Sequence, residues 1–146
     1  MTQKKILIVE DNKDLLELIG KYLRGSGWEV ALAHGTRECW DRLTQVRPSV
    51  VLLDMLLSED SGFEIARRLK REHAYRQIPI VAMTGLSSRH NVQRCFEAGC
   101  RAILLKPFRF TALDKILTEL VDPPRPPVGS AASDSSGARD LRLGGI

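Results

Sequence analysis

The chain has 146 residues, a length typical of one folded domain with at most a tail. Hydrophobic residues make up 43% of it and charged residues 27%, the balance of an ordinary globular protein, which excludes a collagen-like or wholly disordered chain. The net charge of +4 is modest and aromatic residues make up only 5%, so we expect no direct binding of nucleic acid.

The apolar runs are short, and the longest cover only residues 6–9, 50–53 and 103–105. A membrane-spanning helix needs roughly 18 apolar residues, so we expect no membrane insertion. The first run stops at Glu10, too early for a secretory signal. The three cysteines show no C-x-x-C spacing and predict neither disulfides nor a zinc site. These features indicate a cytoplasmic protein.

Short apolar runs alternate with segments of helical period along residues 1–121. The predicted strands are 6–9, 30–33, 50–53, 78–83 and 102–105, and the predicted helices are 13–24, 36–46, 62–73, 88–98 and 110–121. Five such strand–helix units predict an α/β fold with a parallel sheet covered by helices on both faces. Nearly continuous apolar strands such as ILIV and VVLL are typical of a sheet buried on both sides.

The composition changes after Val121. Pro, Gly and Ser supply 12 of the 25 residues in 122–146, and no apolar period is present. Such a segment buries too little surface to offset its ordering entropy. We therefore expect a folded domain over residues 1–121 and a disordered tail over 122–146.

Chemically active residues follow four of the five predicted strands. They are Glu10 and Asp11, Asp54, Thr84, and Lys106. In an open parallel sheet, ligands bind beyond the carboxyl ends of the strands, so these side chains are expected to converge at one edge.

Crowded carboxylates either gain a raised pKa or bind a cation, and Mg²⁺ prefers oxygen ligands of this kind. A carboxylate such as that of Asp54 can attack phosphorus to give an acyl phosphate. The ammonium of Lys106 and the hydroxyl of Thr84 would then pair with the phosphoryl oxygens. The set therefore predicts Mg²⁺-dependent phosphoryl transfer.

Residues 5–121 resemble a response-regulator receiver domain of two-component signalling, of the stand-alone kind known from chemotaxis regulators. The segments that carry the resemblance are KILIVED, VVLLDMLLSEDSG, IVAMTG and LLKPF, with Gly62 eight residues after Asp54. The resemblance implies a flavodoxin-like (βα)5 three-layer sandwich whose five parallel strands have the order 2-1-3-4-5. It also implies a cis bond between Lys106 and Pro107.

The resemblance further implies that Asp54 accepts a phosphoryl group from a histidine kinase or histidine phosphotransfer protein. Mg²⁺ would be held by Asp11, Asp54 and the backbone carbonyl of Leu56, with Glu10 acting through water. Thr84 corresponds to the switch hydroxyl of the family. Lys106 corresponds to its phosphate-pairing lysine.

Two functions remain open. In the first, a single-domain regulator takes phosphate on Asp54, catalyses its own phosphorylation and slow dephosphorylation, and signals by binding an unknown protein target, as a monomer or a phosphorylation-dependent dimer. In the second, the chain is an interaction adaptor of receiver fold that does not depend on phosphate. The first predicted helix has more hydrophobic residues than one core-facing stripe requires. The additional ones could form a docking surface for a kinase or phosphotransfer protein, or they could be buried in the core.

Four residues depart from the usual receiver pattern. Ile103 replaces an aromatic residue whose rotation couples phosphate to the face formed by the fourth helix, fifth strand and fifth helix, so phosphorylation is expected to shift the conformational population less, or differently. Ser58 replaces a proline, which predicts a looser loop after Asp54. Leu56 and Leu86 cannot orient a hydrolytic water, which predicts slow self-dephosphorylation.

Other classes fit less well. The turn Glu10–Asp11 would repel the pyrophosphate that a glycine-rich dinucleotide loop binds, and no G-x-x-x-x-G-K-[ST] segment is present. An aspartate-nucleophile phosphatase would need a second Asp where Leu56 stands. The segment after Val121 contains no helix-turn-helix pattern of a transcription factor.

Overall fold

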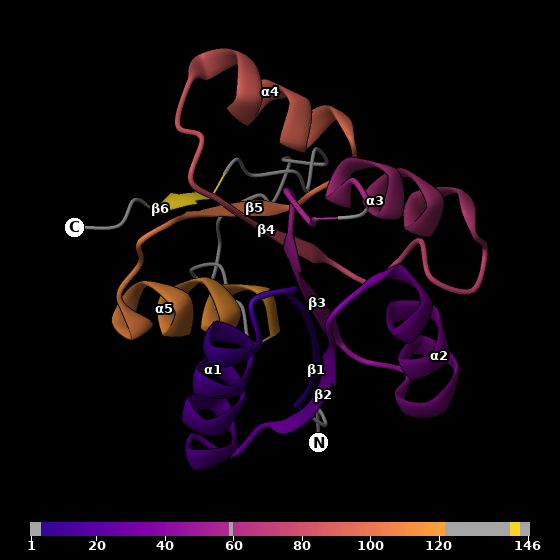
Figure 1. The fold of residues 1–146 in the computed structure, drawn as a ribbon, viewed down its shortest axis with the longest axis vertical. Helices are drawn as coiled ribbons and strands as arrows, with labels where there is room; N and C mark the ends of the chain where they lie inside the picture. The colour runs from indigo at the N-terminus through magenta and orange to yellow at the C-terminus, as the bar shows by residue number, and fades with distance from the viewer. Residues whose placement is uncertain (1–3, 59, 122–140, 144–146) are drawn as a thin grey trace, which may run out of the picture.

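The computed structural model describes residues 4–58, 60–121 and 141–143, which form a central sheet with helices on both faces (Figure 1). The strands are β1 (Lys5–Val9), β2 (Glu29–Ala33), β3 (Val50–Asp54), β4 (Ile80–Thr84), β5 (Ala102–Leu105) and β6 (Leu141–Leu143). The helices are α1 (Lys13–Gly25), α2 (Thr36–Val46), α3 (Gly62–Arg71), α4 (Arg89–Glu97) and α5 (Phe110–Val121).

The sheet is parallel, and its strand order is β2-β1-β3-β4-β5-β6. The predicted α/β class and the order 2-1-3-4-5 are therefore confirmed for the first five strands. Helices α1 and α5 cover one face of the sheet, and α2, α3 and α4 cover the other (Figure 1). The crossover through a helix after each strand is what keeps neighbouring strands parallel.

The core has two halves because side chains alternate across each strand. In β1, Leu7 and Val9 pack with α2, α3 and α4, whereas Ile6 and Ile8 pack with α1 and α5. All five residues of β3 and of β4 are buried. This explains the continuous apolar runs in the sequence, since both faces of these strands are covered.

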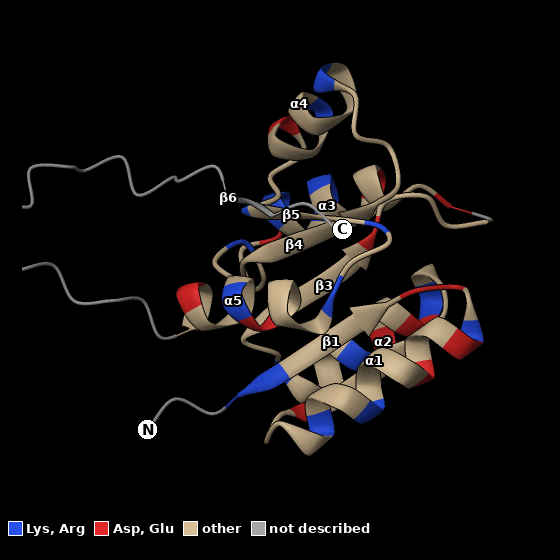
Figure 2. Ribbon diagram, turned by 90° about the vertical axis from the view of Figure 1, so that its left-hand side faces the viewer, with Lys and Arg blue, Asp and Glu red and all other residues tan. Residues whose placement is uncertain are grey.

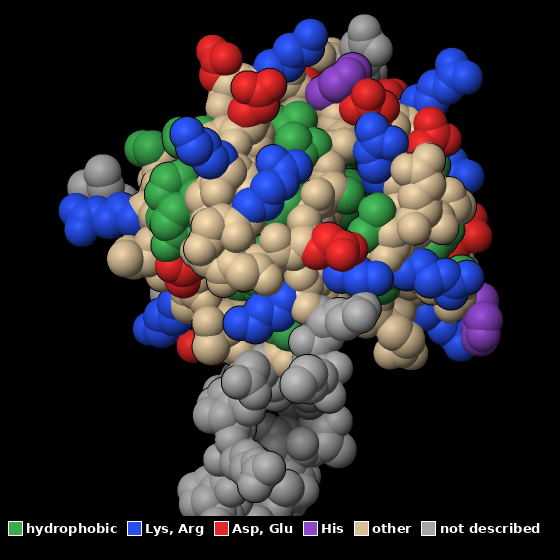
Figure 3. All heavy atoms as spheres, turned by 90° about the horizontal axis from the view of Figure 1, so that it is seen from below, with side chains coloured by type: hydrophobic (Ala, Val, Ile, Leu, Met, Phe, Trp, Pro, Cys, Tyr) green, Lys and Arg blue, Asp and Glu red, His purple; other side chains and the backbone are tan. Residues whose placement is uncertain are grey.

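Polar side chains cap three of the helices and fix where they begin. Asn12, Ser61 and Ser88 each accept a hydrogen bond from a backbone N–H in the first turn of α1, α3 and α4, at 3.1 Å in each case. Such caps satisfy N–H groups that have no partner inside the helix. Charged residues lie mainly on the helices (Figure 2), and basic, acidic and hydrophobic side chains are intermixed on the face seen in Figure 3.

Three residues of the C-terminal segment pair with the edge of the sheet. Leu141–Leu143 lie parallel to β5, in the register Ala102↔Leu141 to Leu104↔Leu143, within the segment for which the sequence predicts a disordered tail. The open edge of β5 offers unpaired N–H and C=O groups to any extended segment, which is the physical basis for this pairing. Residues 122–140 and 144–146 lie outside the described residues.

Candidate functional site

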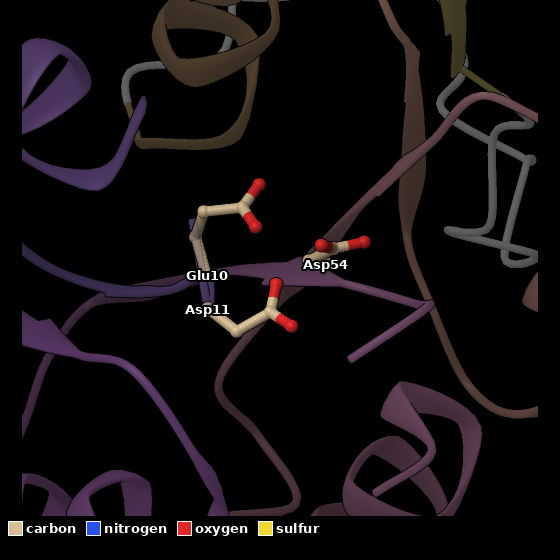
Figure 4. Close-up of side chains that lie close together, drawn as sticks. All are labelled: Glu10, Asp11 and Asp54. Atoms are coloured by element: carbon tan, nitrogen blue, oxygen red, sulfur yellow. The ribbon is translucent and has the colours of Figure 1, made fainter. Parts of the chain in front are cut away.

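The residues that follow the strands meet at one edge of the sheet, as the sequence predicts. Because the strands are parallel and in register, Val9 lies beside Leu53, and Asp54 lies beside Met83. Glu10 and Asp11 follow β1, and Asp54 ends β3. Oxygen atoms of their three carboxylates all lie within 4.8 Å of one another (Figure 4).

Lys106 joins the two buried acids of this cluster. Its Nζ lies 2.6 Å from Oε1 of Glu10 and 3.3 Å from Oδ2 of Asp54. Glu10 is 1% exposed and Asp54 is 4% exposed. Buried carboxylates of this kind need a counter-charge, which the ammonium provides. The peptide bond between Lys106 and Pro107 is cis, as expected.

The electrostatics of the cluster leave room for a second positive charge. Burial, with Asp54 close by, raises the pKa of Glu10 to about 7, although Lys106 acts in the opposite direction. Burial tends to lower the pKa of Lys106, but Glu10 and Asp54 outweigh it, and the pKa is raised. Three carboxylates and one ammonium leave a formal charge of −2 when all are ionised. Hard oxygen ligands with this surplus of negative charge fit a Mg²⁺ ion.

Asp11 is held by the loop that follows Asp54. Its Oδ2 accepts a hydrogen bond from the backbone N–H of Ser58 at 2.8 Å. Partial burial alone would raise the pKa of Asp11, but hydrogen bonds from Ser58 outweigh it and lower this pKa. Proline has no N–H and could not make this bond. The serine that was expected to loosen the loop thus also ties it to the acidic pair.

Two backbone turns hold the side chains of Asp54 and Thr84 in the same way. The N–H of Leu56 donates to Oδ1 of Asp54 at 3.0 Å, and the N–H of Leu86 donates to Oγ1 of Thr84 at 3.0 Å. The side chains of Leu56 and Leu86 are 54% and 47% exposed beside the site. In each turn a backbone N–H therefore binds the carboxylate of Asp54 or the hydroxyl of Thr84, while the leucine side chain is exposed to solvent.

Sequence reasoning missed Asn91, which lies in the first turn of α4 and is 5% exposed. Its Nδ2 donates to Oγ1 of Thr84 at 3.3 Å and to the carbonyl of Leu86 at 2.7 Å. A single Asn seven residues after the threonine is not a signal by itself, because asparagine is common near the start of any helix. Asn91 is identified as part of the site only when its spacing from Thr84 is combined with its burial in the structure.

Gly62 permits the close contact between α3 and the end of β3. A Cβ atom at this position would lie 2.4 Å from the carbonyl oxygen of Asp54 and 2.5 Å from Cα of Met55. Both are backbone atoms, so neither can rotate away. The glycine eight residues after Asp54 is therefore required for α3 to pack against the end of β3.

Comparisons with known proteins agree with this geometry. The family model described as the response regulator receiver domain matches residues 6–118. The polar-differentiation response regulator DivK of Brucella anthropi is 33% identical over 104 residues, which cover 71% of this chain and 85% of DivK. The DivK protein of Brucella ovis is 32% identical with the same coverage.

Two solved structures extend the comparison. The signal receiver domain of the DNA-binding response regulator merR from Colwellia psychrerythraea has a TM-score of 0.76 and 32% identity, covering 82% of this chain and 98% of that chain. The receiver domain of sensor histidine kinase PA1611 from Pseudomonas aeruginosa has a TM-score of 0.74 and 28% identity, with the same coverage. That structure has a magnesium ion coordinated in its active-site cleft.

None of the helices in the described ranges has the length and apolar character that crossing a bilayer requires. The family match covers β1 from Ile6 onward, all of β2 to β5, and every residue of the acidic cluster. The chain belongs to the response regulator receiver domain family.

Proposed function

We propose that this chain accepts a phosphoryl group on Asp54 from a phosphohistidine of a histidine kinase or phosphotransfer protein, and that it signals through protein–protein contacts. The observation that carries the proposal is the placement of Asp54. One of its oxygens accepts from the N–H of Leu56 at 3.0 Å, the other lies 3.3 Å from Lys106, and the residue stands beside the acidic pair. An acid used only as a helix cap has no need of these neighbours.

The reaction follows from these contacts. A carboxylate oxygen of Asp54 attacks phosphorus, a P–O bond forms as the P–N bond to the donor imidazole breaks, and the imidazole regains a proton. Lys106 then pairs with a phosphoryl oxygen, and the Thr84 hydroxyl donates to another. Glu10, Asp11, Asp54 and the backbone carbonyl of Leu56 would hold Mg²⁺, which would neutralise charge on the phosphoryl oxygens.

Incubation of the wild-type chain with acetyl phosphate and Mg²⁺ tests the proposal. We expect a phosphoryl-sized increase in intact mass and reduced mobility on a phosphate-affinity gel. Without any increase, also after incubation with candidate kinases, the phosphate-independent adaptor would be the better explanation. The observation that favours the adaptor is Ile103, which is aliphatic and lies buried in β5, in the half of the core that also contains Val92 and Cys95 of α4.

Exposed apolar side chains suggest how a phosphate donor docks. In α1, Leu16, Ile19 and Leu23 are buried, whereas Leu18 is 54% exposed. Helix α1 starts two residues after Asp11, so Leu18 lies on the element that borders the acidic cluster. A phosphotransfer partner that delivers its histidine to Asp54 would cover this side chain.

Mg²⁺ affinity is expected to rise about tenfold between pH 6 and pH 8. The pKa of Glu10 is raised to about 7, so below this pH the carboxylate is mostly protonated and neutral. Mg²⁺ interacts with the negative charge of Glu10 only after this proton has left. Isothermal titration calorimetry of wild type and Glu10→Gln measures the effect. The Glu10→Gln variant should bind more weakly with no such pH dependence, and a flat wild-type profile would contradict the prediction.

The phosphorylated form is expected to lose phosphate slowly, because Leu56 and Leu86 cannot orient an attacking water. Leu56→Asn should shorten its lifetime about tenfold, which corresponds to about 1.4 kcal/mol in the barrier. Decay of the phosphorylated mass after removal of acetyl phosphate measures it. Leu18→Asn is the matched control, since Leu18 is equally exposed but lies on α1. A wild-type lifetime of seconds would refute the prediction.

A further inference from the structure

Asn91 is a buried polar residue whose side chain has no need to cap its own helix. The first turn of α4 is already capped by Ser88, whose Oγ accepts from the backbone N–H of Asn91 at 3.1 Å. The amide of Asn91 instead points at the end of β4, where it meets Thr84 and Leu86. A buried amide is retained where its hydrogen bonds matter, because burial without them is costly.

The orientation of this amide follows from its partners. The carbonyl of Leu86 can only accept, so the group 2.7 Å away must be Nδ2 and not Oδ1. The two hydrogens on Nδ2 serve the Leu86 carbonyl and Oγ1 of Thr84, at 2.7 and 3.3 Å. One nitrogen atom therefore connects the hydroxyl, the turn between β4 and α4, and the first turn of α4.

These contacts leave the Thr84 hydroxyl free to donate its proton in a hydrogen bond. Its oxygen accepts from the N–H of Leu86 and from Nδ2 of Asn91, which uses both lone pairs. In the part of the chain that the structure describes, no residue accepts the hydroxyl proton from it. The hydroxyl is therefore arranged as a donor, which is what a phosphoryl oxygen requires.

We propose that Asn91 is the positioning residue of Thr84 and that it transmits phosphorylation to the first turn of α4. This inference rests on the proposed function. When the Thr84 oxygen moves toward a phosphoryl group, the 3.3 Å bond lengthens, and Asn91 either follows or loses a partner. Because Asn91 also has a shorter hydrogen bond to the carbonyl of Leu86, the turn between β4 and α4 moves together with Asn91. The response is then centred on Leu86–Asn91, with little change at the buried Ile103.

Amide chemical shifts of the full ¹⁵N-labelled chain test this, recorded with and without beryllofluoride and Mg²⁺. In wild type we expect shifts both in the acceptor loop (residues 55–58) and in the α4 turn (residues 86–93). In Asn91→Ala we expect the acceptor loop to respond still, at about threefold higher beryllofluoride, while the shifts of the α4 turn fall below a third of wild type. Ser88→Ala is the matched control, because it removes the cap of α4 and leaves the contact to Thr84 intact.

The outcomes separate the two claims. An acceptor loop that does not respond in wild type would refute the proposed function itself. A wild-type response with an unchanged α4 turn in Asn91→Ala would overturn the role of Asn91, and so would an equal loss in Ser88→Ala. Thermal unfolding checks that each variant is folded. If Asn91→Ala is not, Asn91→Ser replaces it under the same criteria, since a serine hydroxyl carries a single hydrogen and cannot serve both acceptors.

Discussion

Asp54→Asn is expected to abolish the mass increase that the wild-type chain shows with acetyl phosphate and Mg²⁺. The amide keeps the shape of the side chain and can still accept from the N–H of Leu56. It lacks the nucleophilic carboxylate that forms the acyl phosphate, so no covalent product can arise at this position. Intact-mass spectrometry and phosphate-affinity gels measure the loss.

Asp60→Asn is the control for this variant. Asp60 is an exposed acid six residues further along the same loop, and the acidic cluster does not include it. This control should gain phosphate at the wild-type rate. A phosphoryl-sized increase that persists in Asp54→Asn would place the acceptor on another residue and refute the assignment of Asp54.

Gly62→Ala is expected to destabilise the protein by about 3 kcal/mol and to slow phosphorylation strongly. The added Cβ would lie 2.4 Å from the carbonyl oxygen of Asp54 and 2.5 Å from Cα of Met55, so α3 and the end of β3 must move apart. Overpacking against atoms that cannot rotate away costs 1–3 kcal/mol or more. At roughly 3–4 °C per kcal/mol for a domain of this size, the melting temperature should fall by about 10 °C.

Gly25→Ala provides the comparison. Gly25 ends α1, and a Cβ there would meet nothing within 4 Å. Alanine should be neutral or slightly stabilising at this position, because it forms helix better than glycine. Calorimetry or thermal unfolding followed by circular dichroism compares the two variants, and equal melting temperatures would show that the contact at Gly62 relaxes without cost.

The sequence predicted the fold well because the signals it depends on are local. The period of the apolar residues distinguishes strands from helices, and apolar runs such as VVLL report burial on both faces. The sheet order came from the resemblance to receivers. Boundaries were less accurate: the fourth strand was predicted at 78–83, and β4 spans Ile80–Thr84. The run begins at Ile78, but Pro79 has no N–H to pair, and the strand starts after it.

The sequence also predicted which residues meet in the acidic cluster. Parallel strands bring their carboxyl ends to the same edge, so a reactive residue after each strand must lie near the others. Glu10, Asp11 and Asp54 lie together for this reason, and Lys106 reaches two of them. Their convergence needed only the strand assignments.

Only the tertiary structure decided how these groups are held. The hydrogen bond from Ser58 to Asp11 is 2.8 Å long, and that from Asn91 to Thr84 is 3.3 Å long. At Gly62, an added Cβ atom would lie only 2.4 Å from the carbonyl oxygen of Asp54. Periodicity and composition report the average environment of a residue. They do not specify the relative positions of atoms in different elements to within an ångström, and hydrogen bonds and steric contacts depend on that scale. The sequence alone therefore determined the fold and the members of the acidic cluster, and packing between elements determined how the site is oriented and linked to α4.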